Sequence, residues 1–347
     1  MRGTQQTVSV MNLGRYSRQT AFVRLGIRGQ QKLSAAHAVI IGIGALGTAI
    51  ANNLCRAGVG RLRLIDRDYV ELSNLHRQTL FDEADAAKET PKAIAAGDHL
   101  AKINSEIALE PVIADVNSSN IEELIKDADV VLDGSDNLEL RFLVNEACHK
   151  RRVPWVYGGV LGSAGNCMTV LPGGPCFRCL VPDIPAPGSY PTCSADGVLN
   201  MAVGIIASME SAEAVKIITG SPALNRRLFI VDVWNNTAEY LELQKDPDCA
   251  VCGHGEYELL GHLAESCTIS LCGRDEYQVI PGRKTLIDFP EFAEKLRRAG
   301  SVSYSQFMLS FSNNRIGFNL FSDGRAIIKN VKDGRSARSV YSEYIGL

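Results

Sequence analysis

Short apolar runs alternate with longer amphipathic segments from residue 39 to residue 171. Short runs of Val, Ile and Leu predict buried strands, and segments whose apolar residues recur every three or four positions predict covering helices. The predicted strands are Val39–Ile41, Leu62–Ile65, Ile107–Ala114, Asp129–Leu132, Pro154–Gly158 and Gly165–Leu171. The predicted helices are Ala45–Ala57, Pro91–Asn104, Asn120–Lys126 and Leu138–Arg151. This alternation predicts an α/β fold with a Rossmann-like, doubly wound and mainly parallel sheet.

A long apolar segment, Val198–Ile218, predicts one further helix. Its length would suit a membrane span, but Glu210, Glu213 and Lys216 interrupt it, so we expect a buried core helix. A Pro- and Gly-rich connection precedes it, and two more strands follow at 228–233 and 238–243.

The two ends of the chain have a different character. Residues 1–14 are polar and predict a flexible N-terminus, and the segment at 15–33 predicts a helix across the body. From about residue 255, short strand patterns, a helix and an Asp-Gly hairpin turn predict a small α+β domain. The expected organisation is therefore a tail at 1–14, a main domain at 15–254 and a C-terminal domain at 255–347.

Three glycines follow the first predicted strand in the pattern Gly42-x-Gly44-x-x-Gly47. Such a turn between strand and helix lets backbone N–H groups approach a phosphate at the start of the helix. Asp66 ends the second strand, where a carboxylate accepts hydrogen bonds from ribose hydroxyls. We interpret this unit as a nucleotide site, although a glycine turn can also serve packing alone.

Charged side chains follow other strands of the same predicted sheet. Asp133 and Asp136 come after the strand at 129–132, and the loop at 69–81 carries Asn74 and Arg77. With Lys92, these groups suit phosphoryl or nucleotidyl transfer, which needs cations on phosphate oxygens and a carboxylate for magnesium. No well-placed proton donor for hydride transfer is evident.

Two Cys-x-x-Cys pairs form the strongest local signal, Cys176 with Cys179 and Cys249 with Cys252. Two such pairs predict a closed tetrahedral Cys₄ zinc site, which leaves no open position for substrate and is therefore structural. An iron–sulfur cluster is compatible with the same spacing.

Composition describes an ordinary globular protein, with 46% apolar and 22% charged residues. The net charge of −3 gives no electrostatic basis for binding nucleic acid or an anionic membrane. No export signal or membrane span is evident, so we expect a cytoplasmic protein whose ten cysteines serve metal binding or catalysis.

Together these motifs resemble the ThiF/MoeB/HesA family, the bacterial relatives of ubiquitin-activating enzymes. The resemblance spans about residues 12–253 and rests on segments that occur in the family's order: Arg15-Tyr-Ser-Arg-Gln, the glycine turn, Leu72-Ser-Asn-Leu-His-Arg-Gln, Pro91-Lys92, Asp133-Gly-Ser-Asp-Asn with Arg141, both cysteine pairs and Thr192-Cys193. It implies ATP-dependent adenylation of the C-terminal Gly-Gly carboxylate of a ubiquitin-like sulfur-carrier protein, ThiS-like or MoaD-like, with release of pyrophosphate.

The resemblance also implies a role for each matching residue. The glycines hold ATP and Asp66 its ribose, while Asn74, Arg77 and Lys92 contact the phosphates. Asp136 holds magnesium near the attacking carboxylate, and Asn137 is a further cofactor-binding residue. Arg18 reaches the triphosphate from a partner subunit, which implies a homodimer. Cys193 matches a thiol that joins the carrier's carboxylate in some members, and an idle loop thiol is the alternative.

The C-terminal domain extends beyond the minimal family pattern and resembles the tail of longer Gram-positive members. It shows no rhodanese-like active-site loop, so a separate rhodanese or a cysteine desulfurase would supply sulfur. Thiamine thiazole and molybdenum cofactor synthesis share these motifs, so both pathways stay open. The alternatives are activation of a peptide carboxylate, a small molecule or a modified tRNA base, and a nucleotide-binding module without catalysis.

Overall fold

The computed structural model describes residues 14–184, 197–261, 267–270, 276–281 and 286–346. The chain divides into two compact units, Met1–Gly261 and His262–Leu347. Each unit has a hydrophobic core of its own.

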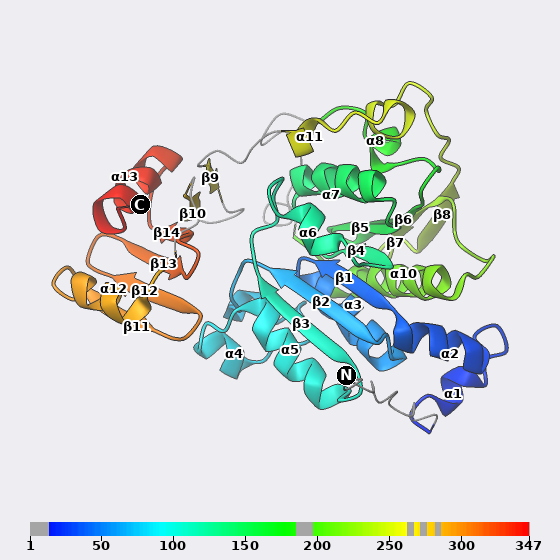
Figure 1. Cartoon of the computed structure of the whole chain (residues 1–347), viewed down its shortest axis with the longest axis horizontal. Helices are drawn as coiled ribbons and strands as arrows, with labels where there is room; N and C mark the ends of the chain where they lie inside the picture. The colour runs from blue at the N-terminus through cyan, green and yellow to red at the C-terminus, as the bar shows by residue number, and fades with distance from the viewer. Residues whose placement is uncertain (1–13, 185–196, 262–266, 271–275, 282–285, 347) are drawn as a thin grey trace, which may run out of the picture. The chain divides into compact units, whose positions relative to one another are not determined.

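The described strands of the first unit form one eight-stranded sheet in the order β3-β2-β1-β4-β5-β6-β7-β8 (Figure 1). The first five strands in this order, β3, β2, β1, β4 and β5, pair in parallel. The remaining three, β6, β7 and β8, each pair antiparallel with the strand before them. The predicted α/β fold class is confirmed. The strands are β1 His37–Ile41, β2 Arg61–Asp66, β3 Ala108–Ile113, β4 Val130–Asp133, β5 Trp155–Leu161, β6 Ala164–Val170, β7 Leu228–Asp232 and β8 Thr237–Leu241.

Helices cover both faces of this sheet (Figure 1). Alternate residues of a strand point to opposite faces, so Ile40 of β1 joins one core while Val39 and Ile41 join the other. The first core packs against α2 Gly26–Ala35, α3 Ala45–Ala57, α5 Lys92–Ile103 and α10 Asn200–Thr219. The second packs against α6 Ile121–Ile125, α7 Leu138–Arg151, α8 Phe177–Leu180, the short helical turn η2 Ala250–His254 and α11 Glu258–Gly261.

Two segments differ from the sequence-based expectation. The segment at 15–33 forms two helices, α1 Ser17–Thr20 and α2, because the chain turns at Gly26, whose φ of +59° favours glycine. The loop at 69–81 contains only the short turn η1 Leu72–Asn74, but it leads into an unpredicted helix, α4 Glu83–Ala87. Asp82 caps α4 by accepting hydrogen bonds from the backbone N–H groups of Ala84 and Asp85.

The segment predicted as a core helix is α10, and its carboxylates at Glu210 and Glu213 are buried. None of the helices in the described part of the chain has the length and apolar character that crossing a membrane requires.

The second unit is an α+β arrangement built on an antiparallel sheet. Its described strands follow the order β11-β12-β13-β14-β10-β9. β9 and β11 were not expected from the sequence, which carries only weak apolar alternation there. The elements are β9 Cys267–Ser270, β10 Glu276–Ile280, α12 Phe289–Leu296, β11 Ser301–Tyr304, β12 Met308–Ser312, β13 Gly317–Phe321, β14 Ala326–Lys329 and α13 Gly334–Tyr344.

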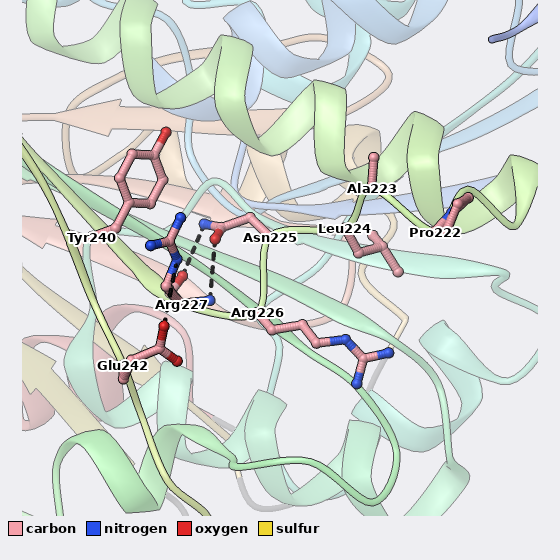
Figure 2. Close-up of a pocket in the computed structure, with 8 residues that line it drawn as sticks. All are labelled: Pro222, Ala223, Leu224, Asn225, Arg226, Arg227, Tyr240 and Glu242. Carbon is pink, nitrogen blue, oxygen red and sulfur yellow. Dashed lines mark hydrogen bonds and ion pairs between the residues drawn. The ribbon is translucent and has the colours of Figure 1, made fainter.

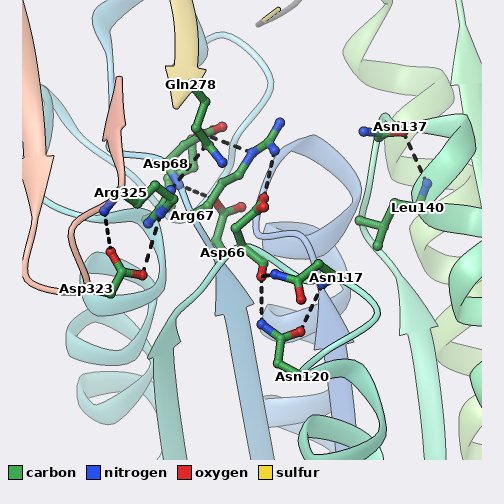
Figure 3. A network of polar contacts seen from close by, with 12 residues as sticks. Asp66, Arg67, Asp68, Asn117, Asn120, Asn137, Leu140, Gln278, Asp323 and Arg325 are labelled. Carbon is green, nitrogen blue, oxygen red and sulfur yellow. Dashed lines mark hydrogen bonds and ion pairs between the residues drawn. The ribbon is translucent and has the colours of Figure 1, made fainter. Parts of the chain in front are cut away.

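Arg325 and Gln278 are buried polar groups within this second unit. Arg325 Nη1 donates to Gln278 Oε1 at 3.3 Å (Figure 3). Its guanidinium lies 3.9 Å from the centre of the Phe321 ring. A guanidinium over an aromatic face gains electrostatic attraction that partly offsets its burial.

Candidate functional site

The glycine turn joins β1 to α3 at the carboxyl edge of the parallel strands. Gly42 has φ +88°, and a Cβ there would lie 2.7 Å from the backbone of Gly134. A Cβ on Gly47 would lie 1.9 Å from the carbonyl oxygen of Gly42. Both glycines are therefore required by the packing of strand and helix.

Gly44 differs from its two neighbours in the motif. It precedes the first turn of α3 with φ −88°, and a Cβ there would meet its nearest atom, the Gly134 oxygen, at an ordinary 3.8 Å. Packing within the chain therefore leaves room for a side chain at this position. The free N–H groups at the start of α3 favour an anion, whose close approach explains a glycine here.

Asp66 ends β2 and organises the turn from the neighbouring strand. Its Oδ2 accepts the backbone N–H of Ile43 at 2.6 Å, and its Oδ1 accepts that of Asp68 at 2.7 Å. Burial raises the pKa of Asp66, and the nearby ammonium of Lys92 opposes this shift. Each carboxylate oxygen accepts more than one hydrogen bond, so both can still receive hydroxyls.

Residues after β2 and β3 form a polar network beside Asp66 (Figure 3). Arg67 Nη1 lies 2.7 Å from Asp115 Oδ1, and the amides of Asn117 and Asn120 both donate to the Asp115 carbonyl. This network holds the two loops against each other at the carboxyl edge.

Lys92 begins α5 and is 8% exposed. Its Nζ lies 3.2 Å from Asp68 Oδ2, and its backbone N–H donates to the Asp68 carbonyl. Burial alone would lower the pKa of Lys92, but the carboxylates of Asp68, Asp66 and Asp136 outweigh it and raise the pKa. Lys92 is therefore a charged donor held at the site, and Asp68 is a partner that sequence reasoning missed.

The loop at 69–81 supplies two predicted residues and one further candidate. Asn74 is buried and accepts the N–H of Glu71, while Arg77 Nη1 donates to the Ser73 carbonyl at 3.0 Å. Gln78 was not assigned a role from the sequence. It is buried, its Oε1 has no hydrogen-bond partner among the described residues, and its Nε2 lies 4.0 Å from the Cβ position of Gly44.

The two aspartates after β4 have different environments. Asp133 is buried, accepts both the N–H and the hydroxyl of Ser135, and lies 2.9 Å from Arg141 Nε. Burial raises its pKa, which the Arg141 charge opposes. Asp136 is exposed, and Asn137 caps α7 through Oδ1 at 3.2 Å from the Leu140 N–H. Asp133 therefore serves the structure, whereas Asp136 is open to a ligand.

A further buried acid, Glu210, lies on α10. Glu210 has 0% exposure, and neither carboxylate oxygen has a hydrogen-bond partner among the described residues. Burial raises the pKa of Glu210 well above its usual range, and the Asp133 charge adds to the effect. A Cβ on Gly158 would lie 2.0 Å from Glu210 Oε1, so β5 needs glycine there.

Both cysteine pairs meet at one point. Cys176 and Cys249 sulfurs are 3.6 Å apart, those of Cys179 and Cys252 are 3.4 Å apart, and all four sulfurs lie within 4.8 Å of one another. Tetrahedral zinc with sulfur at about 2.3 Å places its ligands about 3.8 Å apart, so the four sulfurs fit this ion. Burial opposes ionisation of Cys249, but hydrogen bonds from the backbone N–H of Cys252 and from the thiols of Cys176 and Cys252 outweigh it and lower the pKa of Cys249.

Arg18 lies on α1, away from the glycine turn in the sequence. The segment is held to its own unit by Gln19, which donates to the Ala57 carbonyl, and by Tyr16, whose hydroxyl accepts from Asn104. Arg18 itself is exposed, and no ion pair joins it to the described residues of this chain. Cys193 lies outside the described residues, so its role stays a prediction.

A surface groove of about 470 Å³ lies elsewhere, between the α10–β7 connection and β8 (Figure 2). Arg227 lies over the Tyr240 ring and 3.8 Å from Glu242, so its charge is already matched. Because β7 runs in the same direction as β5, its first residues lie at the amino edge of the sheet, opposite the glycine turn. This groove is therefore separate from the site.

A family model described as the ThiF family matches residues 16–251. The chain belongs to the ThiF family. This confirms the resemblance found in the sequence motifs. The match covers all described elements from α1 to β8 and includes the glycine turn, Lys92, Asp136, the pair Cys176 and Cys179, and Cys249 of the second pair.

Individual relatives extend the ThiF-family assignment. The sulfur carrier protein ThiS adenylyltransferase of Bacillus subtilis (strain 168) is 41% identical over 340 residues, which cover 96% of this chain and 99% of the relative. The SAMP-activating enzyme E1 of Haloferax volcanii is 37% identical, over 76% of this chain and 98% of the relative. The Bacillus similarity therefore extends through the second unit as well.

Solved structures show the same fold. Escherichia coli MccB crystallised with ATP superposes with a TM-score of 0.59 at 23% identity, covering 69% of this chain and 74% of MccB. At this identity the likeness concerns the fold alone.

Proposed function

We propose that this chain adenylates the C-terminal carboxylate of a ubiquitin-like sulfur-carrier protein of the ThiS type. The main support is the similarity to the ThiS adenylyltransferase of Bacillus subtilis, which covers nearly the whole length of both chains. In this reaction a carboxylate oxygen attacks the α-phosphate of ATP. The bond between the α-phosphorus and the bridging oxygen breaks, and pyrophosphate leaves with that electron pair.

The glycine turn and Asp66 would bind the nucleotide. The space above Gly44 and the N–H groups at the start of α3 suit the phosphates, and the unshared lone pairs of Asp66 suit the ribose hydroxyls. Gln78 adds an amide close to Gly44. These groups would orient the α-phosphate toward the carboxyl end of β4.

Cations would stabilise the charge that develops on the leaving pyrophosphate. Lys92 is a pre-positioned ammonium, and Arg77 and Asn74 lie on the adjoining loop. Asp136 would hold magnesium, which when bound neutralises phosphate charge. Asp136 suits this role because it is exposed.

We further propose that two copies of the chain share each site through Arg18. The α1–α2 region exposes Phe22 at 61%, Val23 at 94% and Ile27 at 52%, beside Arg18, which forms no ion pair with the part of the chain that the structure describes. Burial of these three side chains against a second copy would remove apolar surface from water. It would also carry Arg18 toward the partner's nucleotide.

The Cys₄ cluster is proposed as a structural zinc site. The four sulfur positions fit a tetrahedral ion, and all of them come from short segments around α8 and η2. Zinc would tie the connection after β6 to the segment after β8.

Carrier-dependent exchange of pyrophosphate into ATP tests the proposed function. The purified chain is incubated with ATP, magnesium, labelled pyrophosphate and either a ThiS-type or a MoaD-type carrier that ends in Gly-Gly. We expect label in ATP only when a carrier is present, and a higher kcat/KM with the ThiS type. A carrier lacking its last glycine is the matched control.

Preference for the MoaD type would move the chain to molybdenum cofactor synthesis while keeping the chemistry. Exchange that depends on a peptide or a tRNA, with neither carrier active, would contradict the proposal. Nucleotide binding without exchange on any substrate would indicate a binding module.

A further inference from the structure

Asn145, a buried residue of α7, contacts the segment that carries Cys176, and it has no role in the proposed ATP site. Its side chain is almost fully enclosed, and its Oδ1 accepts the backbone N–H of Phe177 at 2.9 Å. Phe177 directly follows Cys176, so this hydrogen bond joins α7 to the residue after a cysteine of the cluster. The N–H of Phe177 also fixes which way the amide lies, because only the amide oxygen can accept.

The amide nitrogen of Asn145 lacks a partner. Nδ2 is buried and forms no hydrogen bond with the part of the chain that the structure describes. An amide nitrogen carries two N–H donors, and a buried donor without a partner costs folding free energy. Since buried donors in folded proteins are paired with few exceptions, this one indicates an acceptor that becomes available only when a ligand binds.

The sulfur of Cys176 can become that acceptor. Burial raises the pKa of the Cys176 thiol to about 11, and the Asn145 amide opposes this shift, so the amide lies within reach of the sulfur. A thiol sulfur is a weak acceptor, whereas the negative charge of a thiolate attracts an N–H strongly. Binding of a metal ion removes the thiol proton. Asn145 Nδ2 would therefore gain its partner when the ion binds.

The charge of a loaded Cys₄ site gives a reason for such a donor. Four thiolates around one Zn²⁺ leave an excess of negative charge, and Cys176, Cys249 and Cys252 are buried away from water. The backbone N–H of Cys179 already acts on the Cys176 sulfur, and that of Cys252 acts on the Cys249 sulfur. Asn145 would add a side-chain donor from a different element of the fold.

Ring packing holds the segment around Phe177 independently of the Asn145 amide. The Phe177 ring lies 5.2 Å from the Phe142 ring of α7 and 5.7 Å from the Trp155 ring of β5. The hydrogen bond from Phe177 to Asn145 is therefore one of several contacts that fix this segment. The two halves of the amide can consequently be tested separately, the oxygen toward Phe177 and the nitrogen toward the cluster.

We propose that Asn145 is a positioning residue of the Cys₄ site, whose Nδ2 donates to the metal-bound sulfur of Cys176 and holds it in the direction that the ion requires. This inference rests on the proposed zinc site and goes beyond it, since it assigns to the site a residue that supplies no ligand. No covalent bond to Asn145 forms or breaks. The alternative is that Asn145 serves only to accept the N–H of Phe177.

The test is Asn145→Asp, because aspartate has almost the same shape as asparagine. Its carboxylate can still accept the N–H of Phe177, but an oxygen without hydrogen replaces Nδ2. Loss of such a partner behind a ligand lowers metal affinity by about 10- to 100-fold, and we expect this rise in the Kd for Zn²⁺, measured by competition with a chelator. Asn53→Asp is the matched control, since Asn53 lies on α3 and donates to Ser211, and it should keep the wild-type Kd.

Cobalt provides a second measurement. Co²⁺ in place of Zn²⁺ absorbs light by charge transfer from its sulfur ligands, and a thiolate that accepts fewer hydrogen bonds gives up charge more readily. We therefore expect the charge-transfer band of Asn145→Asp to move to longer wavelength. The wild type and Asn53→Asp should have the same spectrum, because neither changes the donors around the sulfurs.

A measurement on the wild type covers the case in which Asn145→Asp folds poorly. Nuclear magnetic resonance of protein with isotopically labelled asparagine follows each side-chain amide separately. On addition of Zn²⁺, the Asn145 amide signal should shift and its hydrogens should exchange more slowly with water, because the amide gains a partner. The Asn53 amide signal should stay unchanged.

Wild-type zinc affinity and an unmoved Co²⁺ band in Asn145→Asp would refute the inference and leave Asn145 with Phe177 alone. An Asn145 amide signal in the wild type that does not respond to Zn²⁺ would refute it as well. A wild-type chain that binds no Zn²⁺ would instead refute the zinc site itself, and the inference with it. The proposed adenylation is tested apart from these results, by carrier-dependent exchange.

Discussion

Gly44 and Gly47 belong to one motif but are expected to respond differently to the same substitution. A Cβ on Gly47 would lie 1.9 Å from the Gly42 oxygen, so α3 must move by more than about 1 Å to restore a contact of about 3.2 Å. Overpacking of this kind costs about 1–3 kcal/mol, which corresponds to a fall of about 3–10 °C in Tm. Gly47→Ala should therefore be unstable with or without nucleotide.

Gly44→Ala should fold normally and lose nucleotide affinity. Its Cβ would meet nothing closer than 3.8 Å, and Ala in place of Gly before a helix costs at most about 1 kcal/mol. The new methyl group would occupy the approach of a phosphate oxygen. We expect ATP to bind at least about tenfold more weakly, a loss of about 1.4 kcal/mol.

Thermal shift measurements with and without ATP measure both effects. At an ATP concentration of 100 times the wild-type Kd, the wild type gains about 2.7 kcal/mol, and a variant binding tenfold more weakly gains about 1.4 kcal/mol. The ATP-induced rise in Tm should therefore be roughly halved, and titration calorimetry should give the matching Kd.

Gly97→Ala in α5 is the control, because its Cβ would meet its nearest atom at 3.5 Å and lies away from the turn. It should bind ATP like the wild type. If Gly44→Ala also binds ATP with wild-type affinity, the phosphates do not approach this glycine and the site is wrongly placed. If Gly47→Ala is as stable as the wild type, the packing explanation of this motif fails.

Further predictions concern charge, assembly and metal. Lys92→Ala should lower kcat for pyrophosphate exchange by at least about 100-fold, measured at saturating ATP, and should also lower the Tm, because Asp66 and Asp68 lose the cation that offsets their charge. Mixing Arg18→Ala with Lys92→Ala protein should restore some activity if sites are shared, and no recovery despite demonstrated subunit exchange would contradict the shared site. Cys176→Ser should release zinc and lower Tm, and elemental analysis of fresh protein without zinc would reject the metal assignment. Glu210→Gln should gain stability over the wild type as pH rises from about 4.5, by up to about 1.4 kcal/mol per pH unit, because the unfolded glutamate ionises while the folded one stays protonated. Denaturant unfolding at pH 5 and pH 8 checks the sign, and an equal difference at both pH values would show that Glu210 is ionised in the fold.

The sequence predicted the fold of the first unit because its signals are local. The apolar run Val39–Ile41 identifies a strand, and the apolar residues that recur at helical spacing after Gly44 identify a helix. The parallel topology then follows, because connections between parallel strands are short and right-handed. The same holds for the cysteine pairs, whose spacing within each pair already fits one metal ion. Family membership followed from motifs that occur in a fixed order.

Weaker or context-dependent local signals were missed. The helix α4 depends on the capping pair Asp82 and Asp85, which is visible in the sequence but short. β9 and β11 gain their regular structure from pairing with neighbouring strands, since the hydrogen bonds of a strand lie outside the segment itself.

Only the tertiary structure separated residues that look alike in the sequence. Asp133 and Asp136 are both acids after β4, yet burial and Arg141 make one structural while the other is exposed. Gly44 and Gly47 share a motif, but only the distances to Gly42 and Gly134 distinguish packing from ligand space. Partners such as Asp68 for Lys92 join side chains from different elements. Burial and contact between distant segments set these roles, and neither quantity is encoded in the spacing of residues along the chain.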